Sequence, residues 1–194
     1  CNPHNPTGMI LAQEDLIDFC QQVARVSKAV ILVDEAYYDY VEDGSYQSMI
    51  SLVRQDYPLL VTRTFSKIYG LAGLRVGDGL SPPPVIRELE RVRTNFASIA
   101  FPSLQAALAA LSEKSFLARI KAANARVRKF TVQSLLQKGY FVLSGQTNFI
   151  LLAVPEEARQ VAERLARLKV YVRPFSFQCQ HWLRVTLGKK EEMG

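Results

Sequence analysis

Residues 59–67 read Leu-Leu-Val-Thr-Arg-Thr-Phe-Ser-Lys, so an apolar run leads directly into a short polar segment that ends in a lysine. A second run, residues 29–33, reads Ala-Val-Ile-Leu-Val and is followed at once by Asp34 and Glu35. Continuous apolar runs of this length are typical of strands buried on both faces of a parallel sheet. Ligands bind outside the carboxyl ends of such strands. The two runs therefore predict an α/β fold with a ligand site near these polar residues.

Outward from these runs, apolar periodicity predicts helices and shorter strands. A glycine-rich loop at residues 70–79 follows the strand that begins at Leu59. Helices are expected at residues 13–28, 84–94, 102–138 (with a bend or break near 112–115) and 156–168. Short strands are expected at residues 140–143, 148–154, 170–173 and 182–187. The pattern predicts a parallel α/β part over residues 1–110, then a connecting helix and a small α+β part over residues 111–194.

Composition and charge narrow the class of protein. The 194 residues are 48% hydrophobic and 22% charged, which suits a globular chain with a sizeable core. The net charge is +6, but the densest basic stretch, residues 119–129, falls within a predicted helix. We therefore expect a solvated helix face and no nucleic-acid partner. No apolar run approaches the ~18 residues of a membrane helix, so no membrane partner is expected either.

The cysteines and the chain ends suggest the setting of the protein. Cys1, Cys20 and Cys179 are widely spaced without a CxxC pair, which argues against a disulfide framework or a zinc site. We expect no metal and a cytoplasmic location. The chain opens on Cys-Asn-Pro without methionine and stops soon after a predicted strand, so we expect a fragment cut at both ends.

Taken singly, the polar motifs allow more than one interpretation. Lys67 after a buried strand is a candidate nucleophile if it is partly buried, but a solvated lysine is the commoner case. Asp34 could face a ligand or cap a loop. Arg75 lies among glycines, where a guanidinium beside backbone N–H groups suits a phosphate. Residues 5–8 read Asn-Pro-Thr-Gly, a turn sequence.

Together, these motifs resemble the class I/II aminotransferases, pyridoxal-phosphate (PLP) enzymes of fold type I. Asn-Pro-Thr-Gly at 5–8, Asp-Glu-Ala-Tyr at 34–37, Ser-Lys at 66–67 and Gly-Leu-Arg-Val-Gly at 73–77 occur in the family's order and spacing. The resemblance covers essentially the whole chain. It implies a PLP-dependent transferase fold of type I, with a partial PLP-binding large domain at 1–110 and a truncated small domain from 111.

The resemblance implies a role for each cofactor-binding residue. Lys67 would form the Schiff base with PLP and move a proton between the substrate Cα and cofactor C4′. Asp34 would pair with the pyridinium nitrogen, which makes the ring an electron sink. Asn5 and Tyr37 would donate hydrogen bonds to the phenolic oxygen. The cofactor phosphate would be held by Thr64 and Arg75.

The resemblance also implies substrate contacts, and it is nearest to the histidinol-phosphate aminotransferase branch. Arg184 would bind the substrate α-carboxylate as a bidentate fork. The segments around Asn148 and Arg173 resemble that branch, and Arg173 would bind a substrate phosphate. The implied reaction is transamination of an amino acid or amino-alcohol phosphate, with histidinol phosphate as the first choice and a 2-oxo acid, 2-oxoglutarate, as the partner. Asp78 stands where an aromatic residue is usual, and a carboxylate there would be unfavourable near bound phosphate unless it points away.

Two other functions remain open from the sequence. A threonine-phosphate-type decarboxylase with the same fold would keep Lys67, Asp34 and Arg184. Some transcription regulators carry an aminotransferase-like domain behind a DNA-binding domain.

The family's N-terminal half, which holds much of the phosphate cradle, is missing from these residues. We expect the complete protein to be a homodimer, and the 194-residue piece alone to bind PLP weakly or not at all.

Overall fold

The computed structural model describes residues 1–93 and 99–193, and the chain divides into two compact units. The first unit comprises Cys1–Pro3 and Ile10–Arg119, and the second comprises His4–Met9 and Ile120–Gly194. Each unit has its own sheet with helices against it, which confirms the predicted α/β class.

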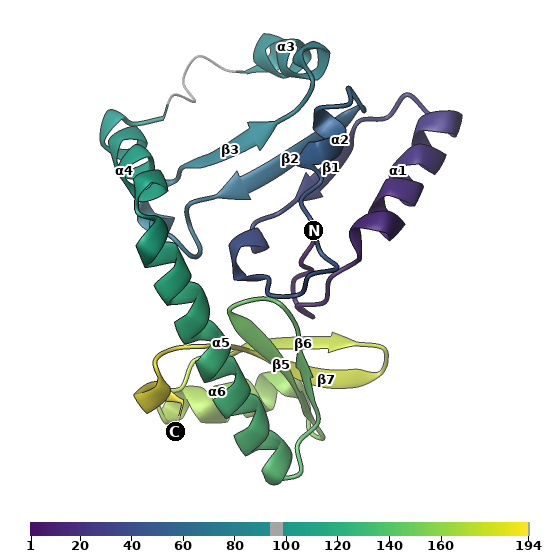
Figure 1. Ribbon diagram of the computed structural model, residues 1–194. Helices are drawn as coiled ribbons and strands as arrows, with labels where there is room; N and C mark the ends of the chain where they lie inside the picture. Colours follow the sequence, from purple (N-terminus) through teal and green to yellow (C-terminus); the bar gives the residue numbers. More distant parts are fainter. Residues whose placement is uncertain (94–98, 194) are drawn as a thin grey trace. The chain divides into compact units, whose positions relative to one another are not determined.

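The sheet of the first unit has three strands in the order β1-β2-β3, side by side in Figure 1. β1 (Ile31–Asp34) runs parallel to β2 (Leu59–Thr64), and β3 (Gly77–Leu80) runs antiparallel to β2. Both apolar runs are therefore strands, as predicted. Asp34 lies opposite Thr62 in the register, so the polar residues that follow the two strands meet at one edge of the sheet.

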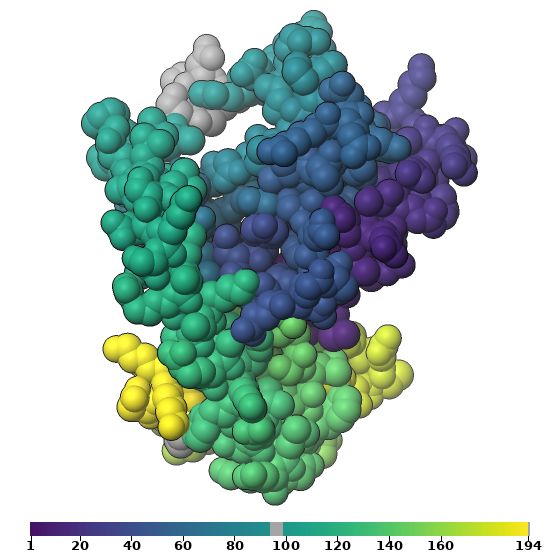
Figure 2. Space-filling view, viewed as in Figure 1, coloured from purple at the N-terminus to yellow at the C-terminus, as the bar shows by residue number. Residues whose placement is uncertain are grey.

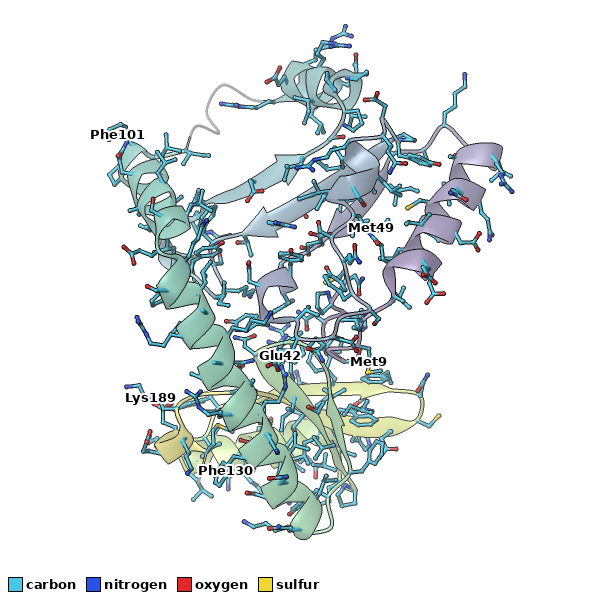
Figure 3. The ribbon with its side chains drawn as sticks, viewed as in Figure 1. Met9, Glu42, Met49, Phe101, Phe130 and Lys189 are labelled. Atoms are coloured by element: carbon cyan, nitrogen blue, oxygen red, sulfur yellow. The ribbon has the colours of Figure 1, made fainter. Side chains whose placement is uncertain are left out.

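Helices cover one face of this sheet. α1 (Gln13–Val26) and α2 (Ile50–Val53) pack on the face that carries Val33 and Val61. Met49, labelled in Figure 3, is fully buried in this core. The other buried members of the core are Leu16, Cys20, Leu52 and Leu59. Because strand side chains alternate, the neighbouring positions face the other way, and Leu32 is 58% exposed there.

Strand β3 corrects the sequence prediction, which treated residues 70–79 as a loop. Gly77 can pair with β2 because it has no Cβ. A Cβ at this position would lie only 2.6 Å from the Arg63 carbonyl oxygen. The glycine therefore allows the close approach to β2 that pairing requires. Glycine-rich sequence is depleted in strands, and here tertiary pairing outweighs that propensity.

Two long helices replace the single stretch expected after residue 101. α4 (Phe101–Ser112) and α5 (Lys114–Gln137) are separated at Glu113, which confirms the predicted break. Before them, α3 (Pro83–Val92) begins with proline in its first turn, where the missing N–H has no helical partner to lose. The expected end of that helix at residue 94 lies outside the described residues. Short 3-10 turns occupy Tyr38–Tyr40, Ala72–Leu74 and Lys190–Glu192.

The second unit contains an antiparallel sheet in the order β4-β5-β7-β6. Its strands are β4 (Val142–Ser144), β5 (Phe149–Val154), β6 (Arg173–Phe177) and β7 (Gln180–Thr186). The strand predicted at 170–173 is wrong in position, because β6 begins at Arg173 to pair with β7.

Both faces of this second sheet carry apolar side chains. α6 (Ala158–Arg167) covers the face of Val154 and Leu183. The opposite face carries Leu151, Trp182 and Phe175. In the described part of the chain, no helix is both long and apolar enough to span a membrane.

Candidate active site

Lys67 lies in a tight loop at the carboxyl end of β2. Phe65 and Ile68, which flank it, are 6% and 4% exposed and anchor the loop in the first unit. The Gly70 N–H donates to the Lys67 carbonyl at 2.9 Å. The Lys67 side chain is itself exposed, with Nζ 5.3 Å from the centroid of the Tyr37 ring. Of the two interpretations that the sequence left open, a solvated lysine is therefore the one that this chain shows.

Asp34 and Tyr37 lie beside this loop, at the end of β1. The Asp34 Oδ1 accepts a hydrogen bond from the Ala36 N–H at 3.0 Å, which holds the carboxylate in a local turn. Carboxylate oxygens can accept several hydrogen bonds, so capacity for a ring N–H remains. The Tyr37 residue is 5% exposed, which restricts its ring to one position beside the Lys67 amine.

Hydroxyl and guanidinium donors gather after β2. Thr64 Oγ1 accepts from the Ser66 N–H at 3.0 Å, and Arg75 Nη1 reaches Ser66 Oγ at 3.5 Å. Arg75 adopts a left-handed backbone with φ of 51° and also donates to the Ala72 carbonyl at 3.0 Å. Sequence reasoning named Thr64 and Arg75 for a phosphate but gave Ser66 no role. Its position immediately before Lys67 was the available signal.

The chemistry of these residues fits PLP. An amine, a carboxylate, a phenol, hydroxyls and a guanidinium match the cofactor's aldehyde, ring nitrogen, phenolic oxygen and phosphate in kind. All of these groups belong to the first unit, at the carboxyl ends of β1 and β2 and on the segments that follow them.

Asn5 belongs to the second unit, in a loop held by two glycines. Gly8 has φ of 73°, and a Cβ on Gly145 would overlap the Gly8 backbone. The Gln146 N–H donates to the Gly8 carbonyl at 2.7 Å. Only glycine at 145 permits this approach, so the segment before β5 fixes the loop that presents Asn5.

Arg184 on β7 is positioned by this loop and by aromatic rings. Its Nη1 donates to Asn5 Oδ1 at 2.8 Å, and its guanidinium carbon lies 5.2 Å from the Phe149 ring and 5.9 Å from the Phe175 ring. Its Nε is buried without a hydrogen-bond partner among the described residues. A buried donor left unpaired is costly, so the site suits an anion such as a carboxylate.

Arg173 lies directly opposite Arg184 in the β6–β7 pairing. It is exposed, with its guanidinium carbon 5.9 Å from the Phe175 ring. Like charges directly opposite each other destabilise a sheet, and a bound anion would offset that repulsion. Asn148 precedes β5 and is partly buried, with its carbonyl accepting from the Leu187 N–H at 2.8 Å.

Asp78 lies opposite Arg63 in the β2–β3 pairing. Both residues line a cavity of about 420 Å³ between the sheet and α4, visible as a hollow beside the teal atoms of α4 in Figure 2. Partial burial of the carboxyl raises the pKa of Asp78, and the Arg63 charge offsets only part of this.

A buried ion pair behind these segments is a feature that sequence reasoning missed. Glu35 is 1% exposed, and its Oε2 lies 2.9 Å from Nη2 of Arg63. A glutamate one residue past a buried strand, with an arginine near the end of the next strand, was the available signal.

Comparison with known proteins agrees with this chemistry. The family model "Aminotransferase class I and II" matches residues 1–194. A histidinol-phosphate aminotransferase of Moorella thermoacetica is 36% identical over 194 residues, which cover 99% of this chain and 50% of that protein. A relative of the same name from Shouchella clausii is 40% identical over 153 residues, covering 78% of this chain and 40% of that protein. The chain thus spans about half the length of the curated relatives it matches.

Solved structures show the same fold. The histidinol-phosphate aminotransferase of Sinorhizobium meliloti in complex with PLP superposes with a TM-score of 0.88 at 27% identity, over 99% of this chain and 52% of that one. A threonine-phosphate decarboxylase of Porphyromonas gingivalis superposes at 0.82 with 19% identity, which shows the fold alone. The predicted fold type I and the predicted cofactor, PLP, are confirmed by the family match and these neighbours.

Proposed function

Because the chain belongs to the class I and II aminotransferase family, we propose that it supplies the amine, the ring-nitrogen partner and the carboxylate-binding arginine of a PLP-dependent aminotransferase. The proposal concerns the complete protein that contains these residues, since the curated relatives are about twice as long. The observation that carries it is Arg184, held by Asn5 with a buried Nε left unpaired.

When bound, PLP supplies an electron sink for the negative charge that develops at the substrate Cα. Lys67 would provide the amine that carries the cofactor, and the same Nζ would accept the proton that leaves the substrate Cα. Asp34 would accept a hydrogen bond from the ring nitrogen and so favour its protonated form. Tyr37 and Asn5 donate hydrogen bonds to the phenolic oxygen.

The phosphate is bound by the segment that follows β2. The Thr64 and Ser66 hydroxyls donate to its oxygens, and the Arg75 guanidinium adds a charge-assisted contact. The 3.5 Å approach of Arg75 to Ser66 supports this grouping.

The substrate is proposed to be a small amine with anionic groups. Arg184 binds a carboxylate as a fork, while Asn5 keeps the guanidinium in place. Arg173, directly across the strand pair, binds the other anionic group, which is the second carboxylate of a 2-oxo diacid or the phosphate of an amino-alcohol phosphate. Histidinol phosphate, which carries a phosphate and no carboxylate, is the amino donor that the names of the relatives favour. We propose 2-oxoglutarate as the amino acceptor and Asn148 as a further substrate contact.

The first test is labelling of Lys67. The complete protein is loaded with PLP, reduced with borohydride and digested, beside Lys67→Ala. We expect the label on the peptide that contains Lys67 and none in the variant, because only that amine bonds to the cofactor. Label on another lysine of the complete protein, or none, would contradict the assignment.

A second assay separates transamination from decarboxylation. The protein is given histidinol phosphate with 2-oxoglutarate, or threonine phosphate alone, and both glutamate and carbon dioxide are measured. Formation of glutamate without carbon dioxide supports the aminotransferase. Release of carbon dioxide from threonine phosphate would contradict the aminotransferase proposal and support a decarboxylase.

The assembly and location of the protein are part of the same proposal. We expect a cytoplasmic homodimer that does not require a metal. Sedimentation of the complete protein as a monomer at assay concentrations would overturn the dimer.

A further inference from the structure

The carboxylate of Glu35 is the centre of a hydrogen-bond network in the first unit. Its side chain is 0% exposed, and Oε1 accepts from the Met49 N–H at 2.8 Å. Its Oε2 accepts from Ser48 Oγ at 2.9 Å and from Arg63 Nε and Nη2 at 3.0 and 2.9 Å. A carboxylate at this depth is tolerated only when it is paired and hydrogen-bonded. The fold therefore maintains this pair at a cost in desolvation.

The partner guanidinium is held from several sides. Arg63 Nη2 also donates to Ser48 Oγ at 2.8 Å, and its guanidinium carbon lies 3.9 Å above the Tyr38 ring. Burial works to lower the pKa of Arg63, but the hydrogen bond and charge of Glu35 outweigh it and raise that pKa. The Asp78 carboxyl, across the strand pair, also faces this guanidinium.

The position of the pair in the sequence links it to the cofactor residues. Glu35 directly follows Asp34, and Arg63 directly precedes Thr64, four residues before Lys67. Successive side chains of a strand point to opposite faces, so the ion pair lies behind the sheet face that carries Asp34 and Thr64. Any shift between the ends of the two strands would change the spacing of Asp34 and Lys67.

We propose that Glu35 and Arg63 are positioning residues, whose ion pair (the Glu35–Arg63 clasp) holds the ends of β1 and β2 at the spacing that lets Asp34 and Lys67 engage opposite ends of one PLP ring. The proposal rests on the proposed function, in which those two residues bind the cofactor. Functional groups must be held within about 0.5 Å of their working geometry, and supporting contacts of this kind provide that.

The test separates positioning from simple stabilisation in the complete protein with PLP. Three quantities are measured: the melting temperature of the apoprotein, the Kd for PLP, and the pH midpoint of the visible absorbance of Lys67-bound PLP. Glu35→Gln removes the ion-pair partner of Arg63, whose side chain is 25% exposed, so we expect a lower melting temperature. We also expect PLP to bind roughly tenfold more weakly and the pH midpoint to shift. Tenfold is roughly the lower end of the loss in affinity seen when a metal site loses a residue that supports one of its ligands.

The double variant Glu35→Gln/Arg63→Met is the decisive one. Because neither residue is then charged, the melting temperature should recover toward that of the wild type. The Kd and the midpoint should stay shifted, because the clasp is still absent. Recovery of all three quantities would mean that the pair acts only through stability, and the proposal would fail.

Two control variants test whether loss of stability, or loss of an unrelated ion pair, gives the same results. Leu16→Ala lowers the melting temperature from the core of the same unit and should leave the midpoint unchanged. Arg164→Met removes the exposed Arg164–Glu156 pair of the second unit and should change none of the three quantities. A midpoint shift in Leu16→Ala as large as in Glu35→Gln would overturn the proposal.

The wild-type protein distinguishes this failure from that of the proposed function. If its Lys67 takes up no PLP, the proposed function and the clasp fail together. If Lys67 is labelled but the clasp variants bind PLP like the wild type, only the clasp fails.

Discussion

At the scale of single residues, two arginines face each other across β6 and β7, and we expect them to select the substrate. Arg184 is fixed by Asn5 and the Phe149 ring, whereas Arg173 is exposed at the strand start. This asymmetry assigns the rigid arginine to the group that all substrates share, and the exposed arginine to the group that varies.

Arg173→Gln should therefore reduce activity selectively. For substrates with a second anion, loss of one charge-assisted contact worth about 1.5–3 kcal/mol lowers kcat/KM roughly 10- to 100-fold. For an amino acid with an uncharged side chain, kcat/KM should stay near the wild-type value. Steady-state kinetics with both substrate types checks this, and an equal loss for both would show that Arg173 does not discriminate.

Asp78 gives a pH-dependent prediction. Its pKa is raised by partial burial of the carboxyl, so the folded state favours the protonated form. At a pH above the pKa that Asp78 has in the folded protein, its ionisation lowers the free energy of unfolding. This cost vanishes below the pKa of Asp in the unfolded chain, about 3.9. Asp78→Asn should raise the melting temperature at neutral pH, and the gain should shrink as the pH falls through the folded pKa.

The control for this prediction is Asp43, whose pKa is shifted in the opposite direction. Hydrogen bonds from the Ser45 hydroxyl and backbone N–H lower the pKa of Asp43. Asp43→Asn should therefore lower the melting temperature at neutral pH, with no effect once the wild-type carboxyl is protonated. If both variants shifted the melting temperature in the same direction, the raised pKa of Asp78 would not explain the effect of its substitution.

At the scale of elements, the contact between the Asn5 loop and the segment before β5 is the tightest backbone approach that we find among the glycines of the described chain. Gly145→Ala would force its Cβ into the Gly8 backbone, so the loop must move. Overpacking of this kind costs about 1–3 kcal/mol. Because the loop carries Asn5, we expect a lower melting temperature together with a higher KM for the carboxylate substrate.

A second glycine provides the matched control. A Cβ on Gly44 would meet nothing within 4 Å, so Gly44→Ala should leave both quantities unchanged. A normal KM in Gly145→Ala, despite a lower melting temperature, would show that the loop does not position Arg184 through Asn5.

At the scale of the whole molecule, the sheet of the first unit has unpartnered surface. β1 and β3 are its outer strands in the described chain, and Leu32 in the middle of β1 is 58% exposed. Open strand edges and exposed apolar side chains mark contact surfaces. We therefore propose that these residues need further chain to complete the cofactor site.

The corresponding experiment compares two lengths of the protein. PLP is titrated into the 194-residue chain and into the complete protein, and circular dichroism verifies that both are folded. We expect weak or undetectable binding by the 194-residue chain, because Lys67 is exposed in it. Equal Kd values for the two lengths would show instead that this half of the site is complete.

The sequence by itself determined the elements and the order of the chemical groups. The apolar runs before Asp34 and Lys67 are strands because β-branched and apolar side chains suit a buried sheet. The break at Glu113 and most helix bounds also follow from local periodicity. Such signals depend on neighbouring residues only, so they can be read without the fold.

Only the tertiary structure decided which distant residues meet. Arg184 and Asn5 are 179 positions apart, and their contact depends on how β7 and the Asn5 loop are placed. The Glu35–Arg63 clasp and strand β3, which sequence reasoning missed, depend on the pairing register of β1, β2 and β3. The exposure of Lys67 likewise follows from what packs around it. Register and packing are set by contacts summed over the whole fold, so a local pattern in the sequence can suggest such a pair but cannot fix its geometry.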